Sequence, residues 1–400
     1  MEGDHIKINH WLLPLSWLYG LGVRFRNLLF DMGILRSKSF DVPVIAVGNL
    51  TVGGTGKTPH VEYLIKLLQN QMKVAVLSRG YKRKTEGYLL ADMQSTVSDI
   101  GDEPFQMKHK FPKVSVAVCK KRVEGIQRLT AHDKDLDVIL LDDAFQHRYV
   151  KPGINILLVD YHRLVIYDEL LPAGRLREPV SGKNRADMVI VTKCPKVLNP
   201  MNVRVITKAM DLFPYQELFF TTLAYEPLHP VFPKEATAPT APWAATMTRH
   251  AAIPKTTRVL LLTGIASPIQ MITDIKEGFG SEPTTLAFSD HHDFQVEDIA
   301  LINDTFASLP SPRIIVTTEK DAVRLAHAEG LSEEVRQCLY ALPIRIRFML
   351  DQREQFNEKI ISYVRKNSRN SILAQSKGDN KPKDSHRSGD RPRTISFRNN

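Results

Sequence analysis

Short apolar runs alternate with amphipathic, helix-like stretches along most of this chain. The first series of apolar runs lies at residues 42–47, 73–77, 114–118, 138–141, 154–159 and 188–191, and a second series lies at 218–223, 259–262, 285–288, 314–317 and 339–346. Continuous runs of Val, Ile and Leu separated by helices are typical of parallel strands buried on both faces. The pattern therefore predicts an α/β fold with a parallel sheet flanked by helices.

An irregular stretch between residues 225 and 255 separates the two series. It contains Pro227, Pro230, Pro233, Pro239, Pro242 and Pro254. Because proline interrupts both helices and central strands, we place a boundary between two α/β lobes near residues 216–256. The expected division is a helical segment at 1–38, a first lobe at 39–215, a smaller second lobe at 216–365 and a tail at 366–400.

The N-terminal segment at residues 11–23 carries no charged side chain and contains Trp11, Trp17 and Tyr19. As a helix it would span about 20 Å, which is short of the hydrocarbon core of a bilayer at about 30 Å. Aromatic residues beside an apolar stripe, followed by Arg24 and Arg26, suit a helix that lies in the membrane interface. Packing on the protein's own core is the alternative, and a full membrane span is not expected.

The net charge of +10 is concentrated near the carboxyl-terminal end. Residues 366–400 hold nine Lys or Arg against three Asp, which gives +6 and leaves +4 for the rest of the chain. Few apolar residues accompany these charges, so the segment is expected to be a basic, disordered and solvated tail. Contact with anionic lipid headgroups is an alternative. Nucleic acid is disfavoured, because no aromatic residues are interleaved with the basic ones.

The three cysteines, Cys119, Cys194 and Cys338, show no metal-ligand spacing, and their odd number argues against a disulfide framework. These observations favour a reducing compartment. No secretory signal is expected, since the N-terminus carries Glu2 and Asp4 and lacks a small-residue cleavage site after a compact apolar core.

A glycine-rich loop follows the first apolar run directly and precedes a helical stretch. It consists of Thr51, Val52, Gly53, Gly54, Thr55, Gly56, Lys57 and Thr58. In this setting the backbone N–H groups and the helix N-terminus bind phosphate oxygens, Lys57 reaches the β- and γ-phosphates, and the Thr58 hydroxyl ligates Mg²⁺. The loop predicts a P-loop NTPase-like sheet that binds ATP and Mg²⁺. One departure is Thr51, where the strict pattern has Gly.

A second nucleotide element is the apolar run at residues 138–141, which ends in Asp142 and Asp143. In phosphate-loop proteins such a strand lies beside the loop strand, and its terminal Asp holds Mg²⁺ directly or through water. An apolar strand that ends in Asp is a weak signal alone, but it is strong together with the loop. Asp142 is the first candidate for the metal, and Asp143 is the second.

Three further polar clusters follow other predicted strands of the first lobe. They are residues 78–81, which include Arg79, Gly80 and Tyr81, residues 101–104, which include Asp102 and Glu103, and residues 171–179, which include Arg177 and Glu178. Each cluster alone would more often be a surface turn. Because the carboxyl ends of parallel strands meet at one edge of the sheet, we expect the three clusters to line a single site there.

The second lobe carries two polar clusters of its own. Residues 288–294 include the adjacent histidines His291 and His292, and residues 318–321 open a helix after a strand. Adjacent side chains rarely point at one ion, so a zinc site is not expected at the histidines. Helix capping explains the second cluster as well as a functional role does.

In this order the clusters make the chain resemble the tetraacyldisaccharide 4′-kinase family, the lipid A 4′-kinases of Gram-negative bacteria. The matching stretches are residues 47–49 with 51–58, 78–81, 101–104, 142–147, 176–179, 290–292 and 318–321. Residues 13–16 with Tyr19 and Gly20 are similar to the family's membrane-docking segment. Ala144 stands where the family usually has Gly, and the tail after residue 366 lies outside the resemblance.

The resemblance implies a specific reaction at the membrane. The family uses MgATP to phosphorylate the 4′-hydroxyl of a tetraacylated glucosamine disaccharide 1-phosphate, which gives lipid IV-A in lipid A biosynthesis. It implies a peripheral protein on the cytoplasmic face of the inner membrane. The expected partners are the acylated disaccharide and the membrane surface, with no nucleic acid and no obligate protein partner.

The resemblance also implies roles for individual residues. Asp102 is the base that accepts the proton of the sugar hydroxyl, and His291 of the second lobe supports it. Arg177 neutralises phosphate oxygens, and Glu178 assists the metal. The expected contacts to the disaccharide are Asn49, Arg79, Gly80, Tyr81, Glu103 and Arg122.

Three other classes compete with this interpretation. Partitioning ATPases carry a second lysine where this chain has Val52. A GTPase is disfavoured because residues 192–195 begin like the guanine-reading motif but end in Pro195 instead of Asp. A non-enzymatic membrane adaptor would leave Asp102, Arg177 and His291 without a purpose.

Overall fold

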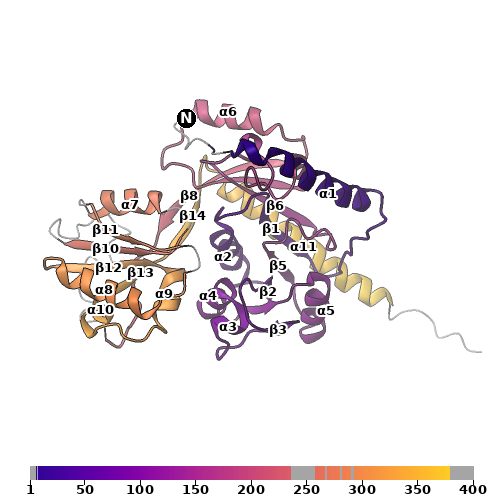
Figure 1. Cartoon of the computed structure of the whole chain (residues 1–400). Helices are drawn as coiled ribbons and strands as arrows, with labels where there is room; N and C mark the ends of the chain where they lie inside the picture. The colour runs from indigo at the N-terminus through magenta and orange to yellow at the C-terminus, as the bar shows by residue number, and fades with distance from the viewer. Residues whose placement is uncertain are drawn as a thin grey trace, which may run out of the picture.

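The computed structural model describes residues 6, 8–235, 257–265, 268–279, 282–289 and 292–378. Its elements form two lobes, each built around one sheet (Figure 1). The sheet of the first lobe has the strand order β14-β8-β7-β6-β1-β5-β2-β4-β3, and that of the second lobe has the order β11-β10-β12-β13-β9. The predicted α/β class with a parallel sheet is confirmed.

The first sheet is parallel except at its two edges. Its strands are β1 (Val44–Asn49), β2 (Val74–Ser78), β3 (Leu89–Leu90), β4 (Ser115–Val118), β5 (Val138–Asp142), β6 (Ile154–Asp160), β7 (Met188–Thr192), β8 (Glu217–Tyr225) and β14 (Ile344–Phe348). Strand β3 is antiparallel to β4, and β14 is antiparallel to β8. Strand β1 lies between β5 and β6, so the strand order reverses there, which is where open parallel sheets bind ligands.

Helices cover both faces of this sheet. One face carries α2 (Lys57–Leu68), α3 (Val97–Ile100), α4 (Asp102–Lys110) and α11 (Arg353–Gly378), and the other carries α5 (Arg122–His132), α6 (Pro200–Met210) and the 3-10 helices η2 (Val165–Tyr167) and η3 (Val180–Arg185). Side chains of β1 alternate between the two layers: Ile45 and Val47 pack with α2, whereas Val44 and Ala46 pack on the side of α5. The continuous apolar runs of the sequence therefore serve two cores.

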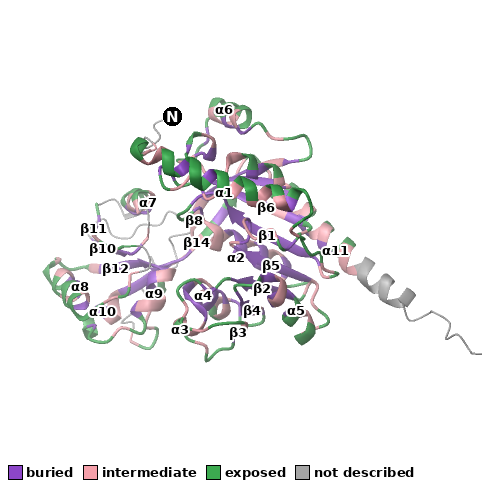
Figure 2. Ribbon diagram, turned by 45° about the vertical axis from the view of Figure 1, so that its right-hand side comes forward, coloured by how far each residue is buried: buried purple, intermediate pink, exposed green. Residues whose placement is uncertain are grey.

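The N-terminal segment forms η1 (His10–Leu12) and the long helix α1 (Leu13–Asp31). Only a narrow face of α1 is buried, at Ser16, Gly20 and Phe30. Its outward face is exposed (Figure 2) and carries the large apolar side chains of Leu15, Trp17, Leu18, Leu21, Phe25 and Leu28, and Trp11 of η1 is exposed just before it. Within the described residues, no helix is both long and apolar enough to cross a bilayer.

The second lobe is a smaller α/β unit. It contains β9 (His229–Pro230), β10 (Arg258–Thr263), β11 (Thr284–Ala287), β12 (Arg313–Thr318) and β13 (Leu339–Leu342), with helices α7 (Ile269–Phe279), α8 (Val296–Ser308), α9 (Glu319–Leu325) and α10 (Glu333–Cys338). Strands β10 to β13 run parallel, and β9 pairs antiparallel with β13. The helix α9 faces α4 of the first lobe.

The structure differs from the expected division at the second lobe. The boundary at residue 216 assigns β8 to that lobe, but β8 pairs with β7 in the first sheet. The apolar run at 339–346 was expected to be one strand, yet Pro343 separates β13 in the small sheet from β14 in the large one. Helix α11 then packs Phe356, Ile360 and Val364 into the first core. The chain thus leaves the first lobe after β8 and returns at β14.

The expected tail and the expected irregular stretch lie only partly within the described residues. Helix α11 continues past the expected start of the tail at residue 366 and ends at Gly378. The rest of the tail, from 379 to 400, lies outside the described residues, as do Pro239, Pro242 and Pro254 of the irregular stretch.

Candidate active site

The glycine-rich loop lies between β1 and α2, as the sequence predicts. Gly53 and Gly56 have φ values of 110° and 82°, a region in which other residues are strained. Strand β5 lies directly beside β1, with Val47 opposite Asp142. The two nucleotide elements therefore meet at the carboxyl edge of the sheet, which confirms the predicted pairing of the loop strand with the acidic strand.

Two neighbours hold the loop from behind. His60, one turn into α2, has its Nδ1 at 2.7 Å from the carbonyl oxygen of Gly56 and its Nε2 at 3.1 Å from the Thr221 hydroxyl. A carbonyl only accepts, so Nδ1 carries the proton in this arrangement. Burial lowers the pKa of His60 to about 4, so the ring is neutral near pH 7. The carbonyl oxygen of Thr55 accepts a hydrogen bond from the Thr192 hydroxyl at 3.0 Å.

The segment at residues 170–178 runs along the other side of the loop. The N–H of Val52 donates to the carbonyl of Arg175 at 2.8 Å, and the N–H of Arg177 donates to the carbonyl of Leu50 at 2.7 Å. These backbone bonds bring the third polar cluster of the sequence against the nucleotide loop. They place Arg177 next to the loop, at the edge of the sheet where this cluster was expected.

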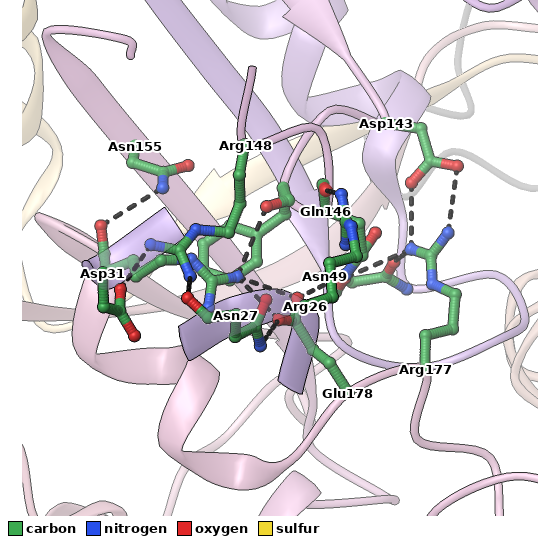
Figure 3. A network of polar contacts seen from close by, with 12 residues as sticks. Arg26, Asn27, Asp31, Asn49, Asp143, Gln146, Arg148, Asn155, Arg177 and Glu178 are labelled. Carbon is green, nitrogen blue, oxygen red and sulfur yellow. Dashed lines mark hydrogen bonds and ion pairs between the residues drawn. The ribbon is translucent and has the colours of Figure 1, made fainter. Parts of the chain in front are cut away.

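Lys57 and Arg177 converge on Asp143. Lys57 Nζ lies 3.6 Å from Asp143 Oδ1, and the guanidinium of Arg177 spans both carboxylate oxygens at 3.0 and 3.4 Å (Figure 3). Burial alone would raise the pKa of Asp143, but the two cations lower it to about 2. Asp143 is therefore ionised and holds two cations of the kind that bind phosphate.

Asp142 lies in a different environment one residue earlier. Its carboxylate is buried, and burial together with the nearby Glu103 and Asp143 raises its pKa to about 7. Its Oδ2 accepts a hydrogen bond from the Ser78 hydroxyl at 3.2 Å, whereas its Oδ1 has no hydrogen-bond partner among the described residues. A buried carboxylate oxygen without a partner costs free energy unless a cation or donor reaches it.

These features fit a magnesium ion. The Thr58 hydroxyl lies in the first turn of α2, beyond the loop, and Asp142 ends the adjacent strand. No group of three or more His, Cys, Asp or Glu that could hold a metal occurs in the described parts of the chain. Magnesium in nucleotide sites needs no such cage, because water and phosphate complete its coordination.

Glu178, expected beside the metal, has other partners. Its two oxygens lie 2.8 and 2.9 Å from the guanidinium of Arg185, and Oε1 also accepts from Gln146 at 3.1 Å. Gln146 in turn donates to the carbonyl of Asn49 at 2.6 Å, and the Asn49 amide oxygen accepts from Arg177 (Figure 3). The structure thus gives Glu178 and Asn49 positions in a network that orients Arg177.

Arg122, expected to contact substrate, is also engaged internally. It is buried, and its guanidinium donates to the carbonyls of Cys119 and Asp142 at 2.6 and 2.9 Å. Burial lowers the pKa of Arg122 to about 10. Its main contacts fix the end of β5, although it also borders the cavity described next.

A cavity of about 400 Å³ opens between α1 and the edge of the sheet. Arg26, Arg79, Lys120 and Arg177 are among the residues that line it, and Tyr19 and Val23 of α1 border it. The Tyr19 hydroxyl donates to the carbonyl of Arg177 at 2.7 Å, which ties α1 to the site. The cavity therefore joins a cationic surface to the exposed N-terminal helix.

Asp102 lies at the N-terminus of α4, across from the second lobe. The backbone at Gly101 has a φ of 89°, and a Cβ there would lie 2.8 Å from the carbonyl oxygen of Tyr81, so only glycine fits. The carboxylate of Asp102 is paired with Arg324 of α9, and Arg324 Nε lies 3.2 Å from Oδ1. His291 lies outside the described residues.

Several residues of the site were not predicted. They are His60, Arg185 and Arg324, whereas Ser78 and Gln146 lie within the predicted stretches 78–81 and 142–147 but were given no role of their own. His60 follows Gly56 by one helical turn, so its spacing could have indicated a contact to the loop. Arg324 acts through a contact to Asp102, 222 positions away, which no local pattern shows.

Fold and site together define a P-loop phosphotransferase. A family model described as tetraacyldisaccharide-1-P 4'-kinase matches residues 8–365. The chain belongs to this family.

Similarity to known proteins covers nearly the whole chain. The chain is 57% identical to the tetraacyldisaccharide 4'-kinase of Phocaeicola vulgatus, over 93% of this chain and 99% of that protein. It is 52% identical to the enzyme of the same name from Bacteroides thetaiotaomicron, over 94% of this chain and 98% of that protein. A crystal structure of LpxK from Aquifex aeolicus in complex with ATP matches with a TM-score of 0.64 and 29% identity, over 88% of this chain and 98% of that chain.

Proposed function

We propose that this chain transfers the γ-phosphate of MgATP to the 4'-hydroxyl of a tetraacyldisaccharide 1-phosphate, forming lipid IV-A. The observation that carries the proposal is the continuity of the site. The nucleotide loop, the cations Lys57 and Arg177, and the cationic cavity under α1 adjoin one another. An anionic sugar with acyl chains needs this combination of a basic pocket and an apolar approach.

The residues at the nucleotide loop and the adjoining edge of the sheet have separate roles in phosphoryl transfer. Lys57 and Arg177 bind oxygens of the transferred phosphoryl group. Asp143 holds both cations in position before ATP binds. Thr58 and Asp142 would hold Mg²⁺, which neutralises charge on the β- and γ-phosphates. Because the transition state is loose, alignment and charge neutralisation supply most of the rate enhancement.

The acceptor side of the reaction needs a group that takes the hydroxyl proton. Asp102 is the candidate base, supported by His291 of the second lobe. The carboxylate of Asp102 has about four acceptor sites, so it can bind a cation and still accept a hydroxyl hydrogen. Arg79, Gly80 and Tyr81 lie in the loop that packs on Gly101, and Glu103 follows Asp102, which supports contacts from this side to the disaccharide.

The outward face of α1 supports a peripheral location at the cytoplasmic face of the inner membrane. Trp17, Leu18 and Leu21 are 75%, 68% and 67% exposed. A helix with aromatic and aliphatic side chains on its outer face binds the boundary of headgroups and acyl chains. In that position the acyl chains of the substrate stay in the bilayer while its sugar enters the cavity.

A transfer assay tests the reaction. The purified protein is incubated with γ-labelled ATP, Mg²⁺ and a set of lipid A precursors in mixed micelles. We expect label on the tetraacylated disaccharide 1-phosphate and none on the monosaccharide precursors. Lack of label on every acylated disaccharide, from a folded protein that binds ATP, would refute the proposal.

A flotation assay with anionic phospholipid vesicles tests the membrane role. Replacing Trp17, Leu18 and Leu21 by Ser should release most of the protein from vesicles, because the buried apolar area is lost. The control replaces Val296 and Leu301, which are exposed on α8 of the second lobe, by Ser. Equal release in both variants would contradict a specific role of α1.

A further inference from the structure

The two lobes contact each other through α4 and α9, and charged residues lie at both ends of this contact. At one end Asp102, the first residue of α4, pairs with Arg324 near the end of α9. At the other end Lys110, the last residue of α4, lies 2.7 Å from Glu319, the first residue of α9. The two helices therefore run antiparallel, with an ion pair at each end.

The pair at the catalytic end is the more buried of the two. The side chains of Arg324 and Asp102 are 9% and 7% exposed, against 19% and 20% for Lys110 and Glu319. Arg324 also donates through Nη1 to the carbonyl of His292 at 2.8 Å. Its guanidinium thus joins Asp102 of the first lobe to the loop of the second lobe that contains His292.

The order of the charges restricts how the helices can pack. Each helix carries its carboxylate at the N-terminal end and its cation at the C-terminal end. In the antiparallel arrangement both ends bring opposite charges together, and a parallel arrangement would bring like charges together. Beyond the end of α9, the ring of His327 lies 6.2 Å from that of Phe105 in α4, edge to face. The contact therefore defines one position of the second lobe over Asp102.

We propose that Arg324 is a positioning residue for the transfer step. This inference rests on the proposed role of Asp102 as the base. The planar guanidinium contacts both oxygens of Asp102 and so fixes the orientation of the carboxylate. Since Arg324 belongs to the second lobe, Asp102 is aligned only when α9 lies against α4. Closure of the lobes and alignment of the base are then one event.

A double-mutant cycle on kcat tests the proposal. Asp102→Asn should lower kcat by roughly 10²–10⁴-fold, the range for a general base. Arg324→Met should lower kcat by about 10²-fold, the cost of a misplaced group. Because Arg324 acts through Asp102, the double variant should have the kcat of Asp102→Asn alone. The KM for ATP should stay within about twofold, since the nucleotide loop belongs to the first lobe.

Two further variants complete the design. Arg324→Lys keeps the charge but lacks the planar guanidinium that contacts both carboxylate oxygens. Its kcat should be about tenfold below wild type, a smaller defect than that of Arg324→Met. It takes the place of Arg324→Met in the cycle if that variant does not fold. The control is Arg336→Met, which removes an ion pair with Glu235 elsewhere in the second lobe. Its kcat should equal that of the wild type.

The outcomes separate this inference from the proposed function. A wild-type protein that transfers no phosphate refutes the function itself. If the wild type is active and Asp102→Asn is impaired, a kcat of Arg324→Met within twofold of wild type overturns the role of Arg324. Multiplication of the two defects in the double variant overturns it as well.

Discussion

The two lobes contribute to the site in different ways. In the first lobe, the nucleotide loop is held by His60 and Thr192 behind it and by the backbone of Arg175 beside it. The second lobe is joined to the first by two chain crossings, which meet where the N–H of Glu226 donates to the carbonyl of Pro343 at 3.0 Å. It reaches the site chiefly through α9.

This difference separates binding from alignment. Groups that are fixed within one lobe can bind ATP whatever the position of the other lobe. Groups shared between the lobes, such as Asp102 with Arg324, pair only when the lobes are in contact. Changes at the nucleotide loop should therefore impair nucleotide binding and catalysis together, whereas changes at the contact between the lobes should lower kcat alone.

The largest effect is expected at Lys57. Lys57→Met removes the cation that faces the transferred phosphate, so kcat/KM should fall by about 10³-fold, as for loss of one transition-state donor. Steady-state kinetics with varied ATP measures the loss. Lys66→Met, on the same helix and paired with Glu226 at the surface, is the matched control. A kcat/KM for Lys57→Met within tenfold of wild type would remove Lys57 from its role.

A smaller effect is expected at His60. His60→Leu removes the ring contacts to the carbonyl of Gly56 and to the Thr221 hydroxyl and leaves only the longer backbone bond of 3.3 Å to that carbonyl, at a cost of about 1–3 kcal/mol. The loop should then bind ATP about tenfold more weakly, with a lower Tm. Fluorescence titration with an ATP analogue and thermal unfolding measure both effects. His132→Leu, at the exposed end of α5, should change neither. Unchanged ATP affinity in His60→Leu would show that the loop keeps its shape unaided.

Local pattern was enough to find most of the first lobe. The apolar runs, the loop at 51–58 and the acidic end of β5 are each contiguous in sequence, and each forms the predicted element. Local pattern does not show which distant strands pair with each other. Nothing within the run at 339–346 says that Pro343 separates strands of two different sheets, because pairing partners are chosen by tertiary contacts.

The same limit applies to the site. Lys57, Arg177 and Asp143 converge because each follows a strand of one sheet, and that rule can be applied to a sequence. Arg324 lies 222 positions from Asp102, on a helix whose start was explained equally well by capping. Its contact depends on how two lobes pack, and one sequence holds no periodic signal for that.

A matched pair of glutamates tests the comparison between the lobes. Lys110 lies 2.7 Å from Glu62 of the first lobe and 2.7 Å from Glu319 of the second. Glu319→Gln weakens a contact between lobes, so kcat should fall by about fivefold, equivalent to about 1 kcal/mol. Glu62→Gln weakens a contact within one lobe and should leave kcat unchanged. Equal kcat values for the two variants would contradict the dependence of alignment on lobe contact.

The smallest effect concerns the stability of the protein without ATP. Burial raises the pKa of Asp142 from 3.8 to about 7, so between these pH values the folded state binds a proton that the unfolded state does not. The stabilisation from this proton is present below about pH 4 and is lost as pH rises to about 7. Asp142→Asn cannot ionise, so its Tm should exceed that of the wild type by about 3 °C at pH 8, with a smaller difference at pH 5.

The neighbouring carboxylate should behave in the opposite way. The pKa of Asp143 is about 2, because Lys57 and Arg177 favour its charged form over the effect of burial. Asp143→Asn should therefore lower Tm at both pH 5 and pH 8, since both values lie above the normal pKa. Thermal unfolding of the three proteins at the two pH values measures the contrast. If Asp142→Asn has a lower Tm than the wild type at pH 8, the buried carboxylate is stabilised by contacts other than those described. Asp142 would then not be destabilised by burial. The claim that the edge of the first sheet is preorganised for binding, while the second lobe supplies alignment, would no longer hold for the first lobe.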